Sequence, residues 1–153
     1  MSKPLLPPLE IPATGETRRI GAVRGSAEGL AIHQAAAEHG RPVLAVVADV
    51  HRARELESEL RFFGSTAHTF PDRETLPYDL FSPHQEVVSD RLSALHRLPA
   101  MESGVLVVPA RTLLHRLPPR DWVAGQAFVM DVGDRLDPDG FRRRLEAAGY
   151  RLV

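Results

Sequence analysis

Hydrophobic positions along the chain alternate between short continuous runs and the wider spacing of amphipathic helices. The run PVLAVVAD, residues 42–49, is apolar up to its final aspartate, which is typical of a parallel strand covered on both faces. In the segment that follows, one helix face carries four apolar residues at i, i+3, i+7 and i+10: Ala53, Leu56, Leu60 and Phe63. A buried strand followed by an amphipathic helix is therefore the first unit that the pattern predicts.

Polar residues and glycines mark where these helices begin and end. Asp49 can cap the helix after the strand, Glu57 and Arg61 can pair on its solvated side, and Gly64 ends it. The stretch LAIHQAAAEHG predicts an alanine-rich helix ahead of the strand, stopped by Gly40.

Further strands and one more helix continue the alternation. A helix rich in Val88, Leu92 and Leu95 follows residue 82, and short strands are predicted at residues 19–23, 67–70 and 104–110. Strand, helix and strand in repeated order predict an α/β fold, with a parallel sheet, right-handed crossovers and flanking helices.

Beyond residue 110 the pattern changes, and the end of the chain resembles the start of another domain. A short helix is predicted in RTLLHRLPPRDW, ended by Pro118 and Pro119, and a strand at 126–133. Asp137 caps a final helix that has Pro138 in its first turn. One face of that helix carries Phe141, Leu145 and Ala148. A strand, YRLV, is predicted to begin at residue 150. The predicted domains are a flexible proline-rich arm (1–13), a first domain (14–135) and a truncated second domain (136–153).

Composition and charge narrow the function classes. The 153 residues carry a formal net charge of -1, whereas a dedicated nucleic-acid binder usually has a strong basic surplus. The chain has no cysteine, which rules out disulfides and thiolate metal sites. The first residues lack the apolar run of a signal peptide, and no stretch is long enough to span a membrane. We expect a cytoplasmic protein that makes no membrane contact.

The turn RGSAEGLA, residues 24–31, lies where a parallel sheet commonly holds a phosphate. A working phosphate loop needs a lysine followed by a hydroxyl residue. In this turn Gly25 and Ser26 are followed by Glu28 in the lysine position and Gly29 in the hydroxyl position. A charge pair at 4 Å is worth about 4 kcal/mol at an effective dielectric near 20, and Glu28 would make it repulsive. The turn therefore predicts a degenerate phosphate loop, with Ser26 as a helix cap and no bound cofactor.

Other candidate chemistry is sparse. The seven histidines form no H-x-x-x-H or H-E-x-x-H set, so no metal site is expected, and no nucleophile turn of the G-x-S-x-G type is present. We expect no catalytic residue. Three consecutive arginines, Arg142, Arg143 and Arg144, are usually a solvated helix face, with partner contact as the minority interpretation.

The stretch TLPYDLFSPHQE, residues 75–86, gathers aromatic residues and prolines. Ser82 to Gln85 has the form of a capping box with Pro83 at the first helical position. Tyr78 and Phe81 remain unexplained by this local reading, because aromatic residues in a loop can bind a partner or cover a sheet edge. The residues leave these two alternatives equal.

The runs TLPYDLFSPHQEVVSDRLSALHRLP and GVLVVPARTLLHRLPP resemble the N-terminal module of the bacterial transcription-repair coupling factor family. GDRLDPDGFRRRLEAAGYRLV is similar to the entry into that family's second domain. The module is in turn similar to the first domain of the repair helicase UvrB. That kinship implies a RecA-like sheet derived from phosphate-loop proteins.

The resemblance implies a full-length ATP-driven DNA translocase that removes stalled RNA polymerase and recruits UvrA in nucleotide-excision repair. It implies that RNA polymerase, DNA and ATP hydrolysis belong to segments outside this chain, and that UvrA docks chiefly on the second domain. There is no room after Tyr78 for the DNA-clamping hairpin of UvrB, so reading of DNA damage is not carried over. The leading hypothesis is a non-catalytic scaffold that docks UvrA and other domains of its parent protein. The alternative is an independent nucleotide-binding or ATPase domain.

Overall fold

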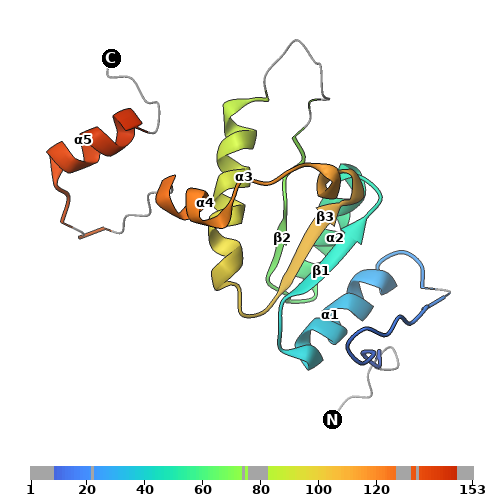
Figure 1. Ribbon diagram of the computed structural model, residues 1–153. Coiled ribbons are helices and arrows are strands. Elements are labelled where there is room, and N and C mark those ends of the chain that lie inside the picture. Colours follow the sequence, from blue (N-terminus) through green and yellow to red (C-terminus); the bar gives the residue numbers. More distant parts are fainter. Residues whose placement is uncertain are drawn as a thin grey trace. The chain divides into compact units, whose positions relative to one another are not determined.

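The computed structural model describes residues 9–21, 23–73, 75, 83–126, 132–133 and 135–147 (Figure 1). The chain divides into two compact units, Met1–Leu117 and Pro118–Val153. The domain boundaries predicted after residues 13 and 135 stay predictions.

A small parallel sheet lies at the centre of the first unit. Its strands are β1 (Val43–Val47), β2 (Ala67–Thr69) and β3 (Val105–Pro109), and their order in the sheet is β1-β3-β2. The last of these three strands in the sequence is therefore the central one. It pairs along its whole length with β1 and along its first three residues with β2.

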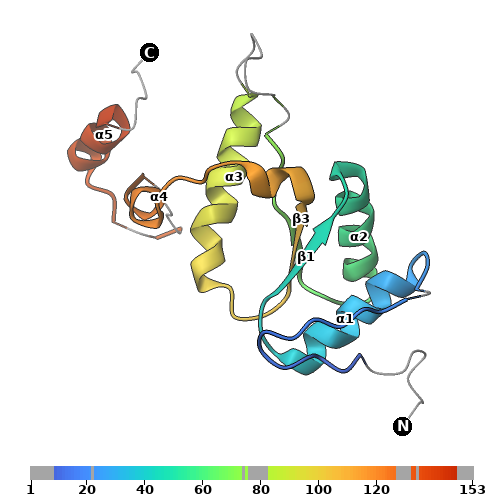
Figure 2. The same ribbon diagram turned by 45° about the vertical axis from the view of Figure 1, so that its right-hand side comes forward.

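Helices flank this sheet, which confirms the predicted α/β class. They are α1 (Ala27–His39), α2 (Val50–Phe62) and α3 (Gln85–Arg97), with 3-10 turns η1 (Leu98–Ala100) and η2 (Ala110–Leu114). In Figure 2 the sheet lies between α2 on one side and α3 on the other. A crossover helix on each side is the arrangement expected for parallel strands.

The core forms between α2 and the sheet. Ala53, Leu56 and Leu60 have no exposed surface, and they belong to one cluster with Val105 and Val107 of β3. Each fully buried leucine contributes about 1.5–3 kcal/mol relative to an exposed one. The predicted apolar face of this helix is thus confirmed for its first three residues.

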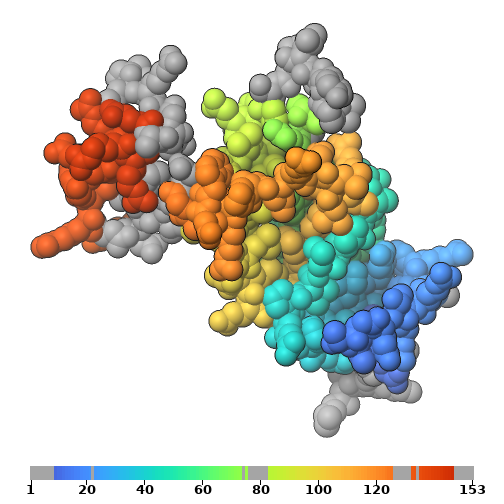
Figure 3. All heavy atoms as spheres, in the orientation of Figure 1, coloured from blue at the N-terminus to red at the C-terminus, as the bar shows by residue number. Residues whose placement is uncertain are grey.

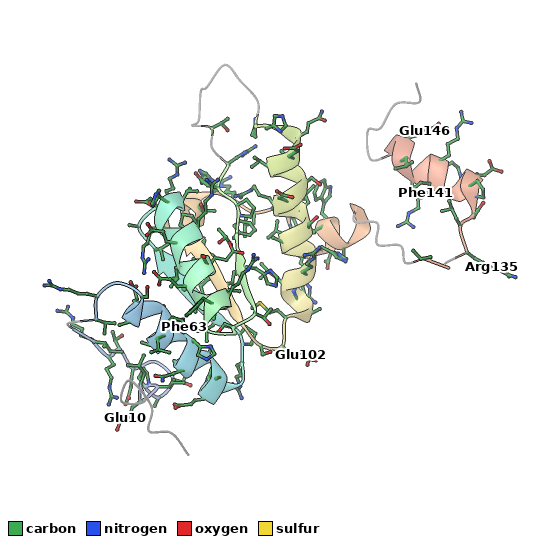
Figure 4. The ribbon with its side chains drawn as sticks, turned by 180° about the vertical axis from the view of Figure 1, so that it is seen from behind. Glu10, Phe63, Glu102, Arg135, Phe141 and Glu146 are labelled. Atoms are coloured by element: carbon green, nitrogen blue, oxygen red, sulfur yellow. The ribbon has the colours of Figure 1, made fainter. Side chains whose placement is uncertain are left out.

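Phe63, the fourth residue of that predicted face, lies just past the end of α2 and is half-buried. Its ring contacts His33 of α1, with centroids 6.3 Å apart. Figure 4, seen from behind, shows Phe63 where α1 and α2 meet. Phe63 thus joins the two helices at the border of the core.

The predicted end signals of the helices are largely confirmed. The Asp49 carboxylate accepts a hydrogen bond of 2.9 Å from the backbone N–H of Arg52. Gly40 closes α1 in the left-handed conformation, with φ 62°. Glu57 and Arg61 pair at 2.6 Å on the outside of α2.

The strand predicted at residues 19–23 is wrong for the residues described there. Residues 19–21 and 23 have no strand pairing, and Ile20 is 52% exposed. Arg18, next to this segment, pairs with Glu10 at 2.7 Å instead. A short apolar run needs a neighbouring strand to satisfy its backbone groups, and the described sheet supplies none to it.

The capping box predicted before α3 is also wrong, because it placed Pro83 at the first helical position and the helix begins two residues later. The helix begins at Gln85 with His84 in the cap position, and the His84 side chain makes no capping hydrogen bond. Ser82, the predicted cap, lies outside the described residues. Leu92 and Leu95 are half-buried rather than buried, so α3 is covered less completely than its pattern predicted.

The second face of β1 is open, contrary to the prediction that the run is covered on both faces. Leu44 is 55% and Val46 50% exposed, whereas Ala45 and Val47 face the core. β1 is an edge strand of the described sheet. Figure 3 shows cyan atoms of this region open on one face of the molecule.

The second unit contains α4 (Arg120–Gln126) and α5 (Pro138–Ala147). The short helix predicted in RTLLHRLPPRDW is confirmed in part: η2 is a short helix that ends at Leu114, before the two prolines, and a separate helix, α4, begins only after them. Proline lacks the N–H that a continuing helix needs, but the Pro119 carbonyl accepts from Val123 in the first turn of α4, at 3.1 Å. The helix predicted after Asp137 is confirmed as α5.

Most of the remaining predictions for the end of the chain fall outside the described residues. Of the strand predicted at 126–133, Gln126 belongs to α4 and residues 132–133 lie in a turn. The rest of that strand, Ala148 and the strand predicted at 150–153 are not described. Phe141 and Leu145 are both half-buried, as expected for residues that share a face of α5.

Candidate functional site

The degenerate phosphate loop lies at the start of α1. Gly25 has φ 58°, a left-handed conformation that favours glycine, and its carbonyl accepts from the N–H of Glu28 at 3.1 Å. Ser26 occupies the cap position, but its side chain makes no capping hydrogen bond, so the predicted capping role is wrong. The turn is a plain entry into a helix whose first turn carries an acidic residue.

Glu28, the residue in the lysine position, is held by a cation from the next helix. Its Oε2 atom lies 2.8 Å from Nη2 of Arg52 on α2. The same guanidinium contacts Glu59 at 3.2 Å and Glu55 at 3.3 Å. Hydrogen bonds to Glu59 and Glu28 raise the pKa of Arg52 well above its usual value, although burial opposes this. The surroundings of the turn are therefore acidic, with Arg52 already engaged by three carboxylates.

Gly29 has a packing role in this turn. A Cβ atom on Gly29 would lie 2.7 Å from Oε2 and 2.8 Å from Cβ of Glu59. The missing side chain therefore allows α1 to approach α2 closely. This accounts for Gly29 without any phosphate.

A second polar cluster lies at the carboxyl ends of β2 and β3, and sequence reasoning missed it. The Asp72 side chain, which follows β2, is only 2% exposed. Its Oδ2 atom accepts hydrogen bonds from Nε (2.6 Å) and Nη2 of Arg111, and its Oδ1 atom accepts one from the Thr112 hydroxyl at 2.9 Å. Arg111 and Thr112 belong to η2, directly after β3. One carboxylate thus ties together the ends of two neighbouring strands.

The ionisation of Asp72 follows from these contacts. Burial alone would raise the pKa of Asp72, but the hydrogen bonds from Arg111 and Thr112 bring that pKa below its usual value. Asp72 is therefore a carboxylate at neutral pH. The signal in the sequence was the placement of Asp-Arg and Arg-Thr just after two predicted strands.

Arg91 of α3 reaches the same strand end. Its Nη1 atom donates to the Pro71 carbonyl, and its guanidinium lies over the Phe70 ring, 4.6 Å from the centroid. Burial and the nearby Arg73 charge lower the pKa of Arg91, while Asp72 opposes this. Arg91 thus packs against the segment that follows β2.

Of the five predicted partner-contact residues, the structure describes only the three arginines of α5. Tyr78 and Phe81 lie outside the described residues. Arg142, Arg143 and Arg144 are all exposed on α5 of the second unit, and Arg142 pairs with Glu146 at 3.2 Å. Three consecutive helical residues span about 200° of the helix surface, so the arginines do not form one face. Their role in partner contact stays a prediction.

The described part of the chain shows neither a cluster of metal-ligating side chains nor a membrane-spanning helix. Among these residues no three histidine or acidic side chains are placed to hold a metal ion. No helix within the same residues is long and apolar enough to cross a bilayer.

Comparison with known proteins gives the family. No family model matches the chain. Over 140 residues, 91% of its length, the chain is 42% identical to the transcription-repair-coupling factor of Escherichia coli. It is 40% identical to that of Haemophilus influenzae over 94% of the chain, and 31% identical to that of Mycobacterium tuberculosis over its whole length.

The chain is therefore homologous to an N-terminal region of the transcription-repair-coupling factors, which confirms the family resemblance seen in the sequence. It spans only 12–13% of the length of these relatives. The kinship with UvrB, and with it the RecA-like origin of the sheet, stays a prediction.

Proposed function

We propose that this region is a non-catalytic scaffold and docking module of a transcription-repair-coupling factor. The observation that carries the proposal is the Glu28–Arg52 ion pair of 2.8 Å at the start of α1. A nucleotide phosphate at this turn would meet a carboxylate instead of a lysine. Arg52, the cation that holds Glu28, is already shared among three carboxylates.

The alternative function, an independent nucleotide-binding or ATPase domain, requires a phosphate to displace these carboxylates. Such a displacement would leave Glu28 and the partly buried Glu59 without their cation, which is unfavourable. The close approach of Gly29 to Glu59 further supports a packing role for the turn. We therefore place ATP binding and hydrolysis of the parent protein in other segments of its chain.

A titration with Mg-ATP tests this proposal at the level of single residues. We expect the backbone amide NMR signals of Gly25, Ser26 and Gly29 to stay unchanged at millimolar Mg-ATP. A residue-level measurement is needed because an anion could also contact arginines elsewhere on the chain. Saturable movement of these three signals, accompanied by ATP hydrolysis, would establish the alternative function.

The proposed parent protein is an ATP-dependent DNA translocase that removes stalled RNA polymerase and recruits UvrA, acting in the cytoplasm. The names of the relatives support the link between transcription and repair. In this proposal the RecA-like first domain is a scaffold. UvrA docks mainly on the second domain, of which residues 136–153 are the beginning, and RNA polymerase and DNA bind other segments.

Capture of UvrA by two versions of the protein tests the docking proposal. A stable interface needs roughly 800 Å² on each partner, more than α5 alone can offer. We expect the 153-residue chain to retain UvrA weakly or not at all, and a version extended through the second domain to retain it at moderate salt. Equal, salt-resistant capture by the short chain would move the docking surface into residues 14–135.

A further inference from the structure

Three arginines gather at the carboxyl ends of β2 and β3: Arg73, Arg91 and Arg111. We name them the arginine cluster. Arg73 follows β2, Arg111 follows β3 and Arg91 reaches the same place from α3. Since β2 and β3 are hydrogen-bonded neighbours, their ends lie side by side. Ligands of open parallel sheets commonly bind outside this edge.

The cluster carries more positive charge than its described surroundings neutralise. Asp72 forms an ion pair with Arg111. Within the described ranges, Arg73 and Arg91 form no ion pair with a carboxylate. Arg91 donates to the carbonyl of Pro71, and Arg73 follows Pro71 by two residues, so both cations lie at the end of β2. In keeping with this, burial and the charge of Arg73 lower the pKa of Arg91. Counted over the described residues alone, the three arginines and Asp72 leave a surplus of two positive charges.

Two of the three guanidinium groups are held in place by the fold. Arg91 is fixed by the Pro71 carbonyl and the Phe70 ring, and Arg111 by the buried Asp72 carboxylate. Arg111 uses Nε and Nη2 for that pair, so Nη1 is not engaged by Asp72, and its side chain remains 56% exposed. A preorganised donor loses less conformational entropy when it binds a ligand.

We propose that the arginine cluster binds a phosphate group. Planar guanidinium groups donate paired hydrogen bonds to phosphate oxygens, and a doubly charged phosphate matches the surplus of two positive charges. The site is distinct from the degenerate loop at Glu28, which lies at the start of α1. It adds a ligand to a region for which the proposed function requires only protein partners.

An NMR titration of the 153-residue chain with inorganic phosphate tests the proposal at constant ionic strength. The side-chain Nε–H signals of Arg73, Arg91 and Arg111 should move together and saturate. Loss of one hydrogen-bonding charge is worth about tenfold to hundredfold in affinity, so Arg91→Gln and Arg73→Gln should each weaken binding by such a factor. Arg97→Gln, on an exposed site of the same helix, is the matched control and should change nothing.

Titrations with two further compounds distinguish the possible ligands. Free glutamate at the same ionic strength is the carboxylate comparison, and we expect it to move the cluster signals at least tenfold more weakly than phosphate. A nucleoside monophosphate should bind as phosphate does if only the phosphate is recognised, and more tightly if the site belongs to a nucleotide. Either result supports the site.

Folding of each variant is checked by amide spectra. Arg91→Lys keeps the charge and most of the side-chain stem, and should retain weakened, saturable binding if Arg91→Gln fails to fold. Linear signal movement up to tens of millimolar phosphate would overturn the proposal. Equal responses to phosphate and glutamate, or an equal loss in Arg97→Gln, would do the same.

Discussion

Arg111→Gln is expected to destabilise the protein more than Asp72→Asn, although both changes remove the same ion pair. The reason is the unequal burial of the partners, because the Asp72 side chain is 2% exposed and that of Arg111 is 56% exposed. Without Arg111, a buried carboxylate loses its cation. Without Asp72, the arginine can turn to water.

The magnitude follows from what remains around each group. Removing one partner of a buried ion pair costs about 3–5 kcal/mol when nothing else compensates. In Arg111→Gln, Asp72 keeps the Thr112 hydroxyl and the backbone N–H of Arg73, so we expect a loss of about 2–3 kcal/mol in the free energy of unfolding. In Asp72→Asn, Thr112 keeps an acceptor, and we expect about 1–2 kcal/mol.

Urea denaturation from pH 7 down to pH 3 measures both effects. In the native protein the lowered pKa of Asp72 means that its stabilisation is complete above about pH 4 and is lost as the pH falls through the folded-state value. In Arg111→Gln the burial effect prevails and raises the pKa of Asp72. Its carboxylate then takes up a proton at a higher pH, which removes the buried charge, so the gap from the native protein should narrow on acidification.

Arg18→Gln is the control for this experiment. Arg18 pairs with Glu10 at 2.7 Å, but both side chains are exposed, so its loss should cost less than about 1 kcal/mol. An Arg111→Gln effect as small as the control at pH 7, or a gap of the same size at both ends of the pH range, would refute the assigned role of burial.

The remaining predictions concern packing. Leu56→Ala should lower the free energy of unfolding by about 2–5 kcal/mol because Leu56 has no exposed surface. Leu92→Ala, at a half-buried site, should cost only about 1 kcal/mol, and equal losses in urea denaturation would show that α3 packs as tightly as α2. Gly104→Ala should destabilise more than Gly64→Ala in the same assay. Both glycines have positive φ, but only at Gly104 would a Cβ clash, 2.6 Å from the Thr66 carbonyl oxygen. Equal losses would remove the clash as a cause.

Much of the fold could be predicted because its signals are local. The face of Ala53, Leu56 and Leu60 needs only helical periodicity, and the Asp49 cap and the Gly40 stop need only neighbouring residues. The strand order β1-β3-β2 could not be predicted, because alternation of strands and helices implies parallel pairing without saying which strands are neighbours. The failed strand at 19–23 had the right residue types but no described partner strand.

In the candidate sites, too, the features with a local signal could be predicted and those that depend on packing between distant residues could not. The Glu28 substitution was visible because the phosphate-loop pattern has fixed spacing, whereas its pairing with Arg52 depends on how α1 packs against α2. The Asp72–Arg111 pair joins residues 39 positions apart, so it forms only once β2 and β3 lie together. Polar residues directly after two predicted strands were its only local signal.

The central position of β3 has a consequence for how the protein is made. β1 and β2 do not pair with each other, and each finds its partner only in β3, the last of the described strands to be synthesised. At about 5–20 residues per second, the ribosome delivers β3 roughly 3–12 seconds after β1. Until then the backbone N–H and C=O groups of β1 that later pair with β3 have no strand beside them. The nascent chain therefore carries an unpaired strand edge, which is prone to association with other strands, until residues 105–109 leave the exit tunnel.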